Sequence, residues 1–183
     1  MSPRRPPRPS TSPEVASSVQ RHRAAGRRAV VCGVITISDT RTEATDTSGA
    51  FIRDALRVEG HRLAFYRIVK DEPGAIVAAI EAAAATEGLA AILLNGGTGI
   101  ASRDRTYETV AGLLERRLDG FGELFRMLSF QEIGPAAMLS RAVAGVYRGR
   151  IVFSMPGSTG AVRLAIERLI LPELGHVVGE LGR

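Results

Sequence analysis

The chain has 183 residues, 45% of them hydrophobic, which is enough for one globular domain with a sizeable core. No apolar run approaches the length of a membrane span, and the N-terminus lacks the apolar centre of a secretory signal, so we expect a cytoplasmic protein. Cys32 is the only cysteine, which excludes an intrachain disulfide and a zinc site made of several cysteines. Its apolar neighbours predict a small buried side chain.

The basic character of the chain is concentrated in its first 28 residues. This tail holds seven arginines and one glutamate, a net charge of +6, whereas residues 29–183 hold 17 basic and 18 acidic residues, a net charge of −1. The tail is also rich in proline and serine, a composition typical of disordered segments. We therefore predict a disordered tail over residues 1–28 and one domain over residues 29–183. Such a tail could touch anionic surfaces weakly, but it does not indicate a dedicated nucleic-acid-binding protein.

Beyond the tail, apolar runs of strand length alternate with segments of helical spacing. Strands are predicted over residues 29–37, 63–69, 89–94 and 151–154. Helices are predicted over residues 49–59, 76–85 (after Pro73), 106–118, 122–131 and 162–171, with a short last element over 172–181. Asp119-Gly120 is expected to break the third helix. Residues 136–147 are ambiguous, because 138–141 could end a helix while 142–147 could begin a strand that turns at Arg148-Gly149.

The alternation of strands and helices predicts a doubly wound α/β fold with a mostly parallel sheet and right-handed crossovers. In such a sheet the carboxyl ends of the strands share one edge, and ligands bind there. Four loops follow predicted strands in this way, over residues 38–41, 70–73, 95–105 and 155–160. We expect these loops to line one crevice.

The most distinctive of these loops follows the third strand. Residues 95–99 read Asn-Gly-Gly-Thr-Gly, and Ser102, Arg103 and Asp104 lead to Thr106, the predicted N-cap of the next helix. Three glycines in four residues allow a tight turn, and backbone N–H groups near the start of a helix suit an anion. The glycines alone fit a simple strand-to-helix turn equally well, whereas the neighbouring charged residues favour a binding loop.

The sequence lacks the motifs of several common catalytic classes. It has no Gly-x-x-x-x-Gly-Lys-Ser/Thr, and its glycines do not fit Gly-x-Gly-x-x-Gly. Lys70 is the only lysine, which leaves little room for lysine-centred phosphate chemistry. His22 lies in the tail, and neither His61 nor His176 adjoins a strand-end loop, so each is predicted to be a surface or packing residue. This argues against a Ser-His-Asp triad.

The predicted crevice instead gathers carboxylates, backbone amides and hydroxyls. Asp39, Asp71 and Asp104 follow strands or the loops beyond them, and such carboxylates suit Mg²⁺, which bridges to substrate phosphates. The amides of residues 96–99 and 157–159 suit phosphate oxygens. Phosphoryl or nucleotidyl transfer mainly needs positioning and neutralisation of charge, which this set can supply. Taken singly, Asp71 and Asp104 fit the role of helix caps equally well.

Together, these motifs resemble the molybdopterin-binding family of small bacterial molybdenum cofactor biosynthesis proteins. The resemblance rests on Gly-Gly-Thr-Gly at 96–99 with Ser-Arg-Asp at 102–104, on Asp-Glu at 71–72, and on Met-Pro-Gly-Ser at 155–158. Ile-Thr-Ile-Ser-Asp and Asp-Thr-Ser-Gly, which begin at Ile35 and Asp46, also agree with it. The similarity covers about residues 29–175 and leaves the tail outside.

The resemblance implies a three-layer α/β fold and an adenylylation reaction. In that reaction the terminal phosphate of molybdopterin attacks the α-phosphorus of Mg-ATP, and pyrophosphate leaves. Asp71 and Asp104 match the two aspartates that are essential in the adenylyltransferase branch, so they are the implied catalytic residues and Mg²⁺ ligands. The residues implied to bind molybdopterin and ATP are Ser38, Asp39, Gly96, Gly97, Thr98, Gly99, Ser102, Arg103, Ser140, Pro156, Gly157, Ser158 and Thr159.

The resemblance also implies a trimer or hexamer. The chain offers apolar helical positions for such an assembly, some of which we expect to be buried between subunits: Phe121, Leu124, Phe125 and Leu128. Other molybdenum cofactor enzymes are candidate partners, and no membrane partner is expected.

Two stretches look more like the protein B branch of the family than the adenylyltransferase branch. Residues 105–108 read Arg-Thr-Tyr-Glu where the adenylyltransferases often have Val-Thr-Pro-Glu, and residues 156–159 read Pro-Gly-Ser-Thr where they often have Pro-Gly-Asn-Pro. The alternative hypothesis is therefore a non-catalytic oligomer of the same pathway that binds pterin or nucleotide. Retention of both aspartates favours activity.

Overall fold

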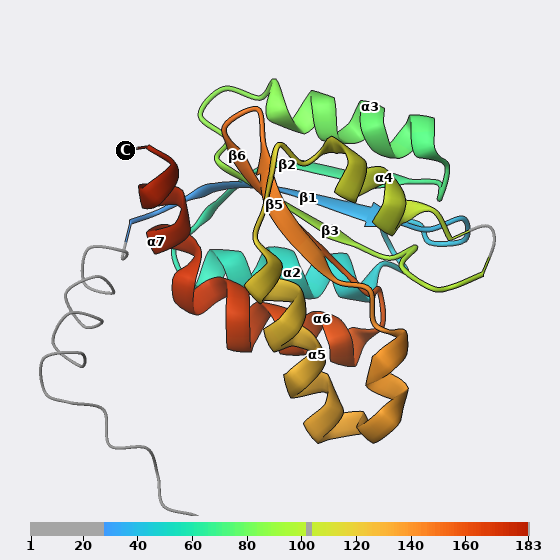
Figure 1. The fold of residues 1–183 in the computed structure, drawn as a ribbon. Helices are drawn as coiled ribbons and strands as arrows, with labels where there is room; N and C mark the ends of the chain where they lie inside the picture. The colour runs from blue at the N-terminus through green and yellow to red at the C-terminus, as the bar shows by residue number, and fades with distance from the viewer. Residues whose placement is uncertain (1–27, 102–103, 183) are drawn as a thin grey trace, which may run out of the picture.

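A six-stranded sheet forms the centre of the computed structural model, which describes residues 28–101 and 104–182 (Figure 1). The strand order is β2-β1-β3-β6-β5-β4, and β2, β1, β3 and β6 are parallel, so the prediction of a mostly parallel sheet is confirmed. β5 and β4 run antiparallel at one edge. The strands are β1 (Val31–Ile37), β2 (Arg62–Val69), β3 (Ala91–Asn95), β4 (Arg116–Arg117), β5 (Val143–Tyr147) and β6 (Arg150–Met155).

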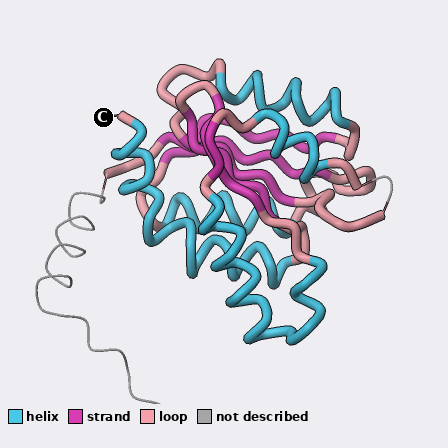
Figure 2. Tube along the Cα trace, viewed as in Figure 1, coloured by secondary structure: helices cyan, strands magenta, loops and turns pink. Residues whose placement is uncertain are grey.

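Helices cover both faces of this sheet and make three layers, as the resemblance implied (Figure 2). One face carries α3 (Pro73–Ala84) and α4 (Thr106–Leu113). The other carries α2 (Thr47–Val58), α5 (Asp119–Ile133), α6 (Thr159–Ala165) and α7 (Leu171–Leu181). A 3₁₀-helix, η1 (Gly134–Leu139), follows α5, and a π-helical turn, η2 (Ile166–Ile170), joins α6 to α7.

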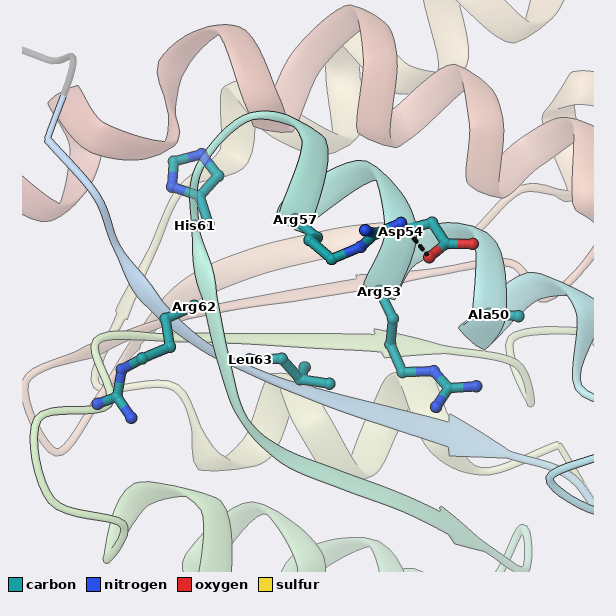
Figure 3. A pocket seen from close by; sticks show the side chains of 7 residues that line it. All are labelled: Ala50, Arg53, Asp54, Arg57, His61, Arg62 and Leu63. Carbon is teal, nitrogen blue, oxygen red and sulfur yellow. Dashed lines mark hydrogen bonds and ion pairs between the residues drawn. The ribbon is translucent and has the colours of Figure 1, made fainter.

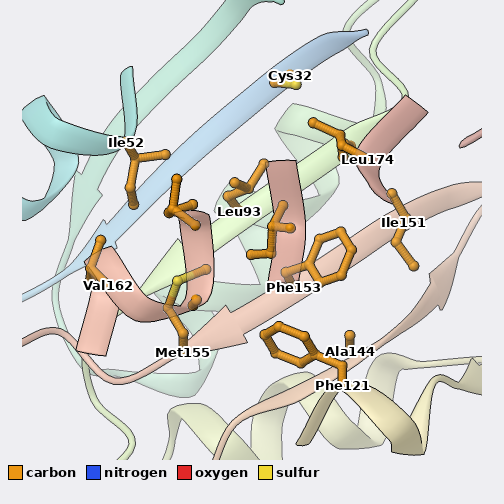
Figure 4. Close-up of a cluster of buried hydrophobic side chains, with 14 of the residues drawn as sticks. Cys32, Ile52, Leu93, Phe121, Ala144, Ile151, Phe153, Met155, Val162 and Leu174 are labelled. Carbon is orange, nitrogen blue, oxygen red and sulfur yellow. The ribbon is translucent and has the colours of Figure 1, made fainter. Parts of the chain in front are cut away.

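The two faces of the sheet bury separate hydrophobic clusters. Figure 4 shows the larger one, in which Phe121 of α5 packs edge-on against Phe153 of β6, with 5.2 Å between the ring centroids. Cys32 is fully buried there, as predicted, and this burial raises the pKa of its thiol to about 12. Because β3 lies inside the sheet and is covered on both faces, its side chains are apolar at every position before Asn95.

The region after α4 differs from the sequence prediction. The helix predicted over 106–118 ends at Leu113, because Leu114 takes an extended conformation and Glu115 donates a backbone hydrogen bond to the Val146 carbonyl, 2.8 Å away. β4 then pairs with β5. Asp119 begins α5 instead of breaking a helix, which places its negative charge at the positive end of the helix dipole.

The C-terminal segment is continuous, although a separate last element was predicted. Residues 159–181 form one helical run, and Pro172 lies in the first turn of α7. Proline lacks the N–H that an interior position would donate, and the preceding π-helical turn changes the bonding pattern at this point. The ambiguous segment 136–147 resolves into η1 and β5, and Arg148-Gly149 forms the turn to β6.

The predicted tail lies outside the described residues apart from Arg28, so its disorder and the domain boundary stay predictions. Within residues 28–101 and 104–182, no helix is both long and apolar enough to cross a membrane.

Candidate functional site

The carboxyl ends of four parallel strands place the four predicted loops at one edge of the sheet. Ile37 of β1 pairs with Val69 of β2, while Asn95 of β3 lies between Thr36 of β1 and Met155 of β6. Main-chain bonds continue past the strands, because the Gly96 N–H donates to the Met155 carbonyl over 3.1 Å. The loops therefore meet as the topology required.

Two glycines of the loop after β3 occupy positions where a side chain would not fit. Gly96 and Gly97 have φ of 108° and 62°, a region that residues with a Cβ rarely adopt. A Cβ on Gly96 would overlap the Ile37 carbonyl oxygen, and one on Gly97 would lie 2.5 Å from Oδ2 of Asp71. A Cβ on Gly157 would lie 2.9 Å from the Gly96 Cα. The glycines thus let the loops after β3 and β6 contact each other and Asp71 directly.

Asp71, which follows β2, lies at the centre of this contact. Its Oδ1 accepts a hydrogen bond from the Thr106 hydroxyl over 3.0 Å, and its carboxylate also accepts from the Arg105 N–H. Its own N–H donates to Oδ1 of Asp39, 3.3 Å away. Thr106 was predicted to be an N-cap, and this is wrong: Arg105 holds the cap position, and Thr106 is the first residue of α4. Its side chain instead fixes the Asp71 carboxylate.

Asp104 completes a pair of carboxylates. Its Oδ2 accepts from the Ala101 N–H over 3.2 Å, and a Cβ on Gly99 would overlap this oxygen. Burial raises the pKa of the Asp71 carboxyl, and the charges of Asp104 and Asp39 raise it further, against the opposing hydrogen bonds from Thr106 and Arg105. Excess negative charge of this kind favours a bound cation.

The donor set can be compared with the needs of Mg²⁺. Among the described residues, no three His, Cys, Asp or Glu side chains form a group that could hold a metal ion. Mg²⁺ does not need such a cage, because it is commonly held by one or two carboxylates together with substrate phosphates and water. Asp71 and Asp104 therefore fit Mg²⁺ that arrives with a nucleotide.

The raised pKa of Asp71 predicts a pH-dependent stability effect. A folded-state pKa above the unfolded value means that ionised Asp71 destabilises the fold at pH 8, and that the effect disappears toward the ordinary pKa of 3.8. Because solvent screens this half-buried group, we expect Asp71→Asn without metal or nucleotide to raise Tm at pH 8 by about 1 to 3 °C. The gain should shrink as the pH falls.

Scanning fluorimetry between pH 8 and pH 5 checks this, with Asp54→Asn as the control. Asp54 pairs with Arg57 on the surface of α2 and should give no comparable shift. A lower Tm for Asp71→Asn at pH 8 would show that the carboxylate stabilises the fold.

A network of buried polar side chains joins Asn95, where the loop after β3 begins, to Asp46 at the start of α2. The Asn95 amide donates to the Thr36 hydroxyl over 2.9 Å, and Thr36 donates to Oδ2 of Asp46 over 2.6 Å. Tyr66 donates to the same oxygen over 2.7 Å, and the Gly49 N–H donates to Oδ1 over 2.8 Å. The last contact makes Asp46 the N-cap of α2. The network links β1, β2 and β3 to this helix start.

The other predicted binding residues occupy varied positions at this edge of the sheet. The Ser38 hydroxyl accepts from the N–H groups of Thr40 and Arg41. Ser158 caps α6 by accepting from the Ala161 N–H. Ser140 lies at the end of η1, next to Arg141. Pro156 is half-buried, and Gly157 and Thr159 are exposed beside Ser158, while Ser102 and Arg103 lie outside the described residues.

Arg141 lies against the loop after β3, although the sequence analysis did not select it. Its Nε donates to the Thr98 carbonyl over 3.0 Å, and its Nη2 donates to the carbonyls of Asp104, over 3.1 Å, and Gly99. Its Nη1 forms an ion pair with Glu108. A single arginine between a 3₁₀-helix and a strand carries no motif, so no local signal pointed to it.

Two cavities in the described part of the chain lie away from this edge of the sheet. One of about 480 Å³ lies between α2 and the amino end of β2, and its three arginines are Arg53, Arg57 and Arg62. Figure 3 shows that their guanidinium groups point in different directions, with Arg57 turned toward Asp54. His61, also in its lining, accepts from the Val30 N–H through Nδ1, which agrees with its predicted packing role. We therefore do not assign the functional site to this cavity, whose lining contains no residue of the four loops.

Comparison with known proteins places the chain in a family. The family model described as "Probable molybdopterin binding domain" matches residues 33–176. A molybdenum cofactor biosynthesis protein B from Halalkalibacterium halodurans is 57% identical over 165 residues, which cover 90% of this chain and 97% of that protein.

Solved structures agree in fold. A crystal structure of a molybdenum cofactor biosynthesis protein B is 52% identical, has a TM-score of 0.84, and the match covers 86% of this chain and 98% of that one. The tungsten cofactor synthesizing protein MoaB from Pyrococcus furiosus is 35% identical with a TM-score of 0.73, covering 85% of this chain and 99% of that one. On its sequence, its fold and the loops that meet at the carboxyl edge of its sheet, the chain belongs to the molybdopterin-binding family.

Proposed function

We propose that this protein acts in molybdenum cofactor biosynthesis as a molybdopterin adenylyltransferase that depends on Mg-ATP. Membership of the family and 57% identity to a molybdenum cofactor biosynthesis protein B support the pathway. In the proposed reaction, a terminal phosphate oxygen of molybdopterin forms a bond to the α-phosphorus of ATP, and the bond from that phosphorus to pyrophosphate breaks. The products are adenylylated molybdopterin and pyrophosphate, and we place the reaction in the cytoplasm.

The observation that carries this proposal is the approach of Asp71 and Asp104 to one glycine-rich loop. Both carboxylates are fixed by backbone N–H groups, and Asp71 by the Thr106 hydroxyl as well. A merely structural pair of caps would not need the raised pKa of the Asp71 carboxyl, which comes first from burial and then from the charges of Asp104 and Asp39. Fixed carboxylates beside a phosphate-sized loop suit the positioning that nucleotidyl transfer requires.

The two carboxylates share one task in this proposal, and the loop amides have another. Asp71 and Asp104 would hold Mg²⁺, and bound Mg²⁺ neutralises charge on the phosphate oxygens and on the departing pyrophosphate. The Gly96 N–H donates to the Met155 carbonyl, so the N–H groups of residues 97–99 would donate to phosphate oxygens, since the glycines let the backbone come close. Residues 156–159 adjoin that loop and form the other wall, where we place part of the pterin or nucleotide.

Assembly is the second part of the proposal. Phe121 and Phe125, which were expected to contribute to a subunit contact, are buried in the core of the single chain, whereas Leu124 is exposed. The exposed apolar side chains instead form what we call the α5–η1 face, with members between 47% and 79% exposed: Leu124, Met127, Phe130, Ile133, Met138 and Leu139. An apolar groove of about 430 Å³ lies within it. We propose that this face is covered in a homotrimer or hexamer.

A charged substitution tests the assembly. A glutamate in place of Phe130, at the centre of the α5–η1 face, should dissociate the oligomer, because burial of an unpaired carboxylate is costly. Light scattering at micromolar concentration should give at least three times the 19.5 kDa chain mass for the wild type, and the chain mass for Phe130→Glu. Val58→Glu, at an exposed apolar residue of α2, is the control and should remain assembled. A monomeric wild type would contradict the proposal.

The reaction itself is tested by following pyrophosphate release. Purified protein is incubated with molybdopterin, ATP and Mg²⁺, and pyrophosphate is detected by a coupled assay. We expect release that requires all three components. Binding of molybdopterin or nucleotide with no release would instead favour the alternative, a non-catalytic oligomer that binds pterin or nucleotide.

A further inference from the structure

The guanidinium group of Arg141 fixes one side of the loop after β3. Arg141 is separated by about forty positions from the loop, yet its donors reach three main-chain carbonyls, those of Thr98, Gly99 and Asp104. Its side chain is only 23% exposed. Charged donors to backbone carbonyls make stronger hydrogen bonds than neutral ones, so this contact holds the loop firmly.

The orientation of these carbonyls determines the orientation of the loop amides. In a trans peptide the C=O and N–H bonds point to opposite sides. Because the carbonyls of Thr98 and Gly99 face the guanidinium, the N–H groups of Gly99 and Ile100 point away from it. Without Arg141, these carbonyls would turn toward water, and the amides would turn with them.

One peptide plane extends this control to Asp71. The carbonyl of Asp104 accepts from Arg141, and the backbone of the next residue, Arg105, acts on Asp71 from the same peptide, where it lowers the pKa of the Asp71 carboxyl. The Asp104–Arg105 peptide therefore connects the guanidinium to Asp71, and it also carries the Asp104 side chain. Rotation of this plane would disturb both carboxylates at once.

Two residues of α4 contact the guanidinium group of Arg141 and fix its position. Glu108 pairs with its Nη1, and the guanidinium lies over the Tyr107 ring, with 5.2 Å between its central carbon and the ring centroid. A lysine could not replace these contacts, because an ammonium group lacks the planar fork that reaches several acceptors in fixed directions.

We propose that Arg141 is a positioning residue of this site, which acts through the main-chain carbonyls of Thr98, Gly99 and Asp104 to aim Asp71, Asp104 and the loop amides. The catalytic part of this inference rests on the proposed adenylylation. The structural part, that Arg141 fixes the Asp104–Arg105 peptide, can be tested by amide exchange without any reaction.

The test compares Arg141→Gln and Arg141→Lys with the wild-type protein. Hydrogen–deuterium exchange, resolved to single residues by mass spectrometry, follows the Arg105 amide, and we expect exchange about tenfold faster in both variants. Pyrophosphate release should show kcat lowered by about 10- to 100-fold and KM for ATP changed by less than about threefold. A purely structural role would lower Tm while kcat of the folded protein stayed at the wild-type value.

Arg148→Gln is the matched control. Arg148 also pairs with a glutamate, Glu81, over 3.0 Å, and lies over a tyrosine ring, Tyr147, at 5.1 Å, but at the opposite end of β5. The substitution Arg148→Gln should leave both the exchange rate of the Arg105 amide and kcat unchanged.

The outcomes separate this inference from the proposed function. If the Arg105 amide exchanges at the wild-type rate in both folded variants, the inference that Arg141 fixes the Asp104–Arg105 peptide is wrong, whatever the activity of the variants. Faster exchange with wild-type kcat overturns the positioning role. If the wild-type protein releases no pyrophosphate, the proposed function fails, and the exchange at Arg105 still decides whether Arg141 holds the peptide.

Discussion

Asp104→Asn will lower the turnover of pyrophosphate release by about a hundredfold, which corresponds to about 3 kcal/mol of transition-state stabilisation. Asparagine keeps the size of the side chain and an oxygen that can accept from the Ala101 N–H, so the loop should keep its shape. What it removes is the negative charge that we place next to Mg²⁺. Steady-state kinetics at saturating ATP and molybdopterin measure the effect.

The same measurement separates catalysis from capping. Asparagine caps a helix as well as aspartate does, so a residue that only caps would keep both stability and turnover after this change. Asp119→Asn is the matched control, because Asp119 pairs with Arg117 at the start of α5 and should retain full turnover. Full turnover in both Asp104→Asn and Asp71→Asn would contradict the catalytic assignment.

Gly97→Ala should affect both folding and activity. The residue has φ of 62°, where a Cβ costs about 1 to 2 kcal/mol, and the added methyl would overlap the Thr106 hydroxyl and lie 2.5 Å from Asp71. We expect Tm to fall by about 3 to 8 °C. Turnover, measured well below that Tm, should fall at least tenfold, because the methyl displaces the Asp71 carboxylate.

A glycine elsewhere in the same region gives the control. Gly112 lies in α4, and a Cβ there would meet nothing within 4 Å. Gly112→Ala should keep wild-type turnover and raise Tm slightly, since alanine favours a helix by about 0.5 to 1 kcal/mol. Equal turnover for Gly97→Ala and the wild type would show that the close contact with Asp71 has no functional role.

The sequence predicted the architecture well because its signals were local. Strong apolar runs marked β1, β3 and β6, the last two bounded by glycine or proline, and their alternation with helices required a parallel sheet with its loops at one edge. The prediction missed β4, because two residues show no periodicity and the strand is defined by its pairing with β5, including the bonds from Glu115 to Val146 and from Leu118 to Ala144. The continuous run from α6 to α7 was missed because proline normally marks a boundary.

The site was only partly predictable for a related reason. Asp71, Asp104 and the glycines stand in recognisable motifs, whereas Arg141 and the hydroxyl of Thr106 gain their contacts from residues 35 to 43 positions away in the chain. A cap residue and the first residue of a helix differ by one position in the sequence, so pattern alone could not show that Thr106 bonds Asp71. Long-range contacts of this kind become visible only when the chain is folded.

The most direct test of the account follows the α-phosphate of ATP. The wild-type protein is incubated with Mg²⁺, molybdopterin and ATP that carries a radioactive label at the α-phosphorus, and the pterin is separated from free nucleotide. The proposed adenylylation predicts that the label moves to the pterin in a one-to-one ratio with the pyrophosphate released, and that Asp104→Asn suppresses both. Label that stays on ATP, under conditions in which the protein binds molybdopterin, would contradict it.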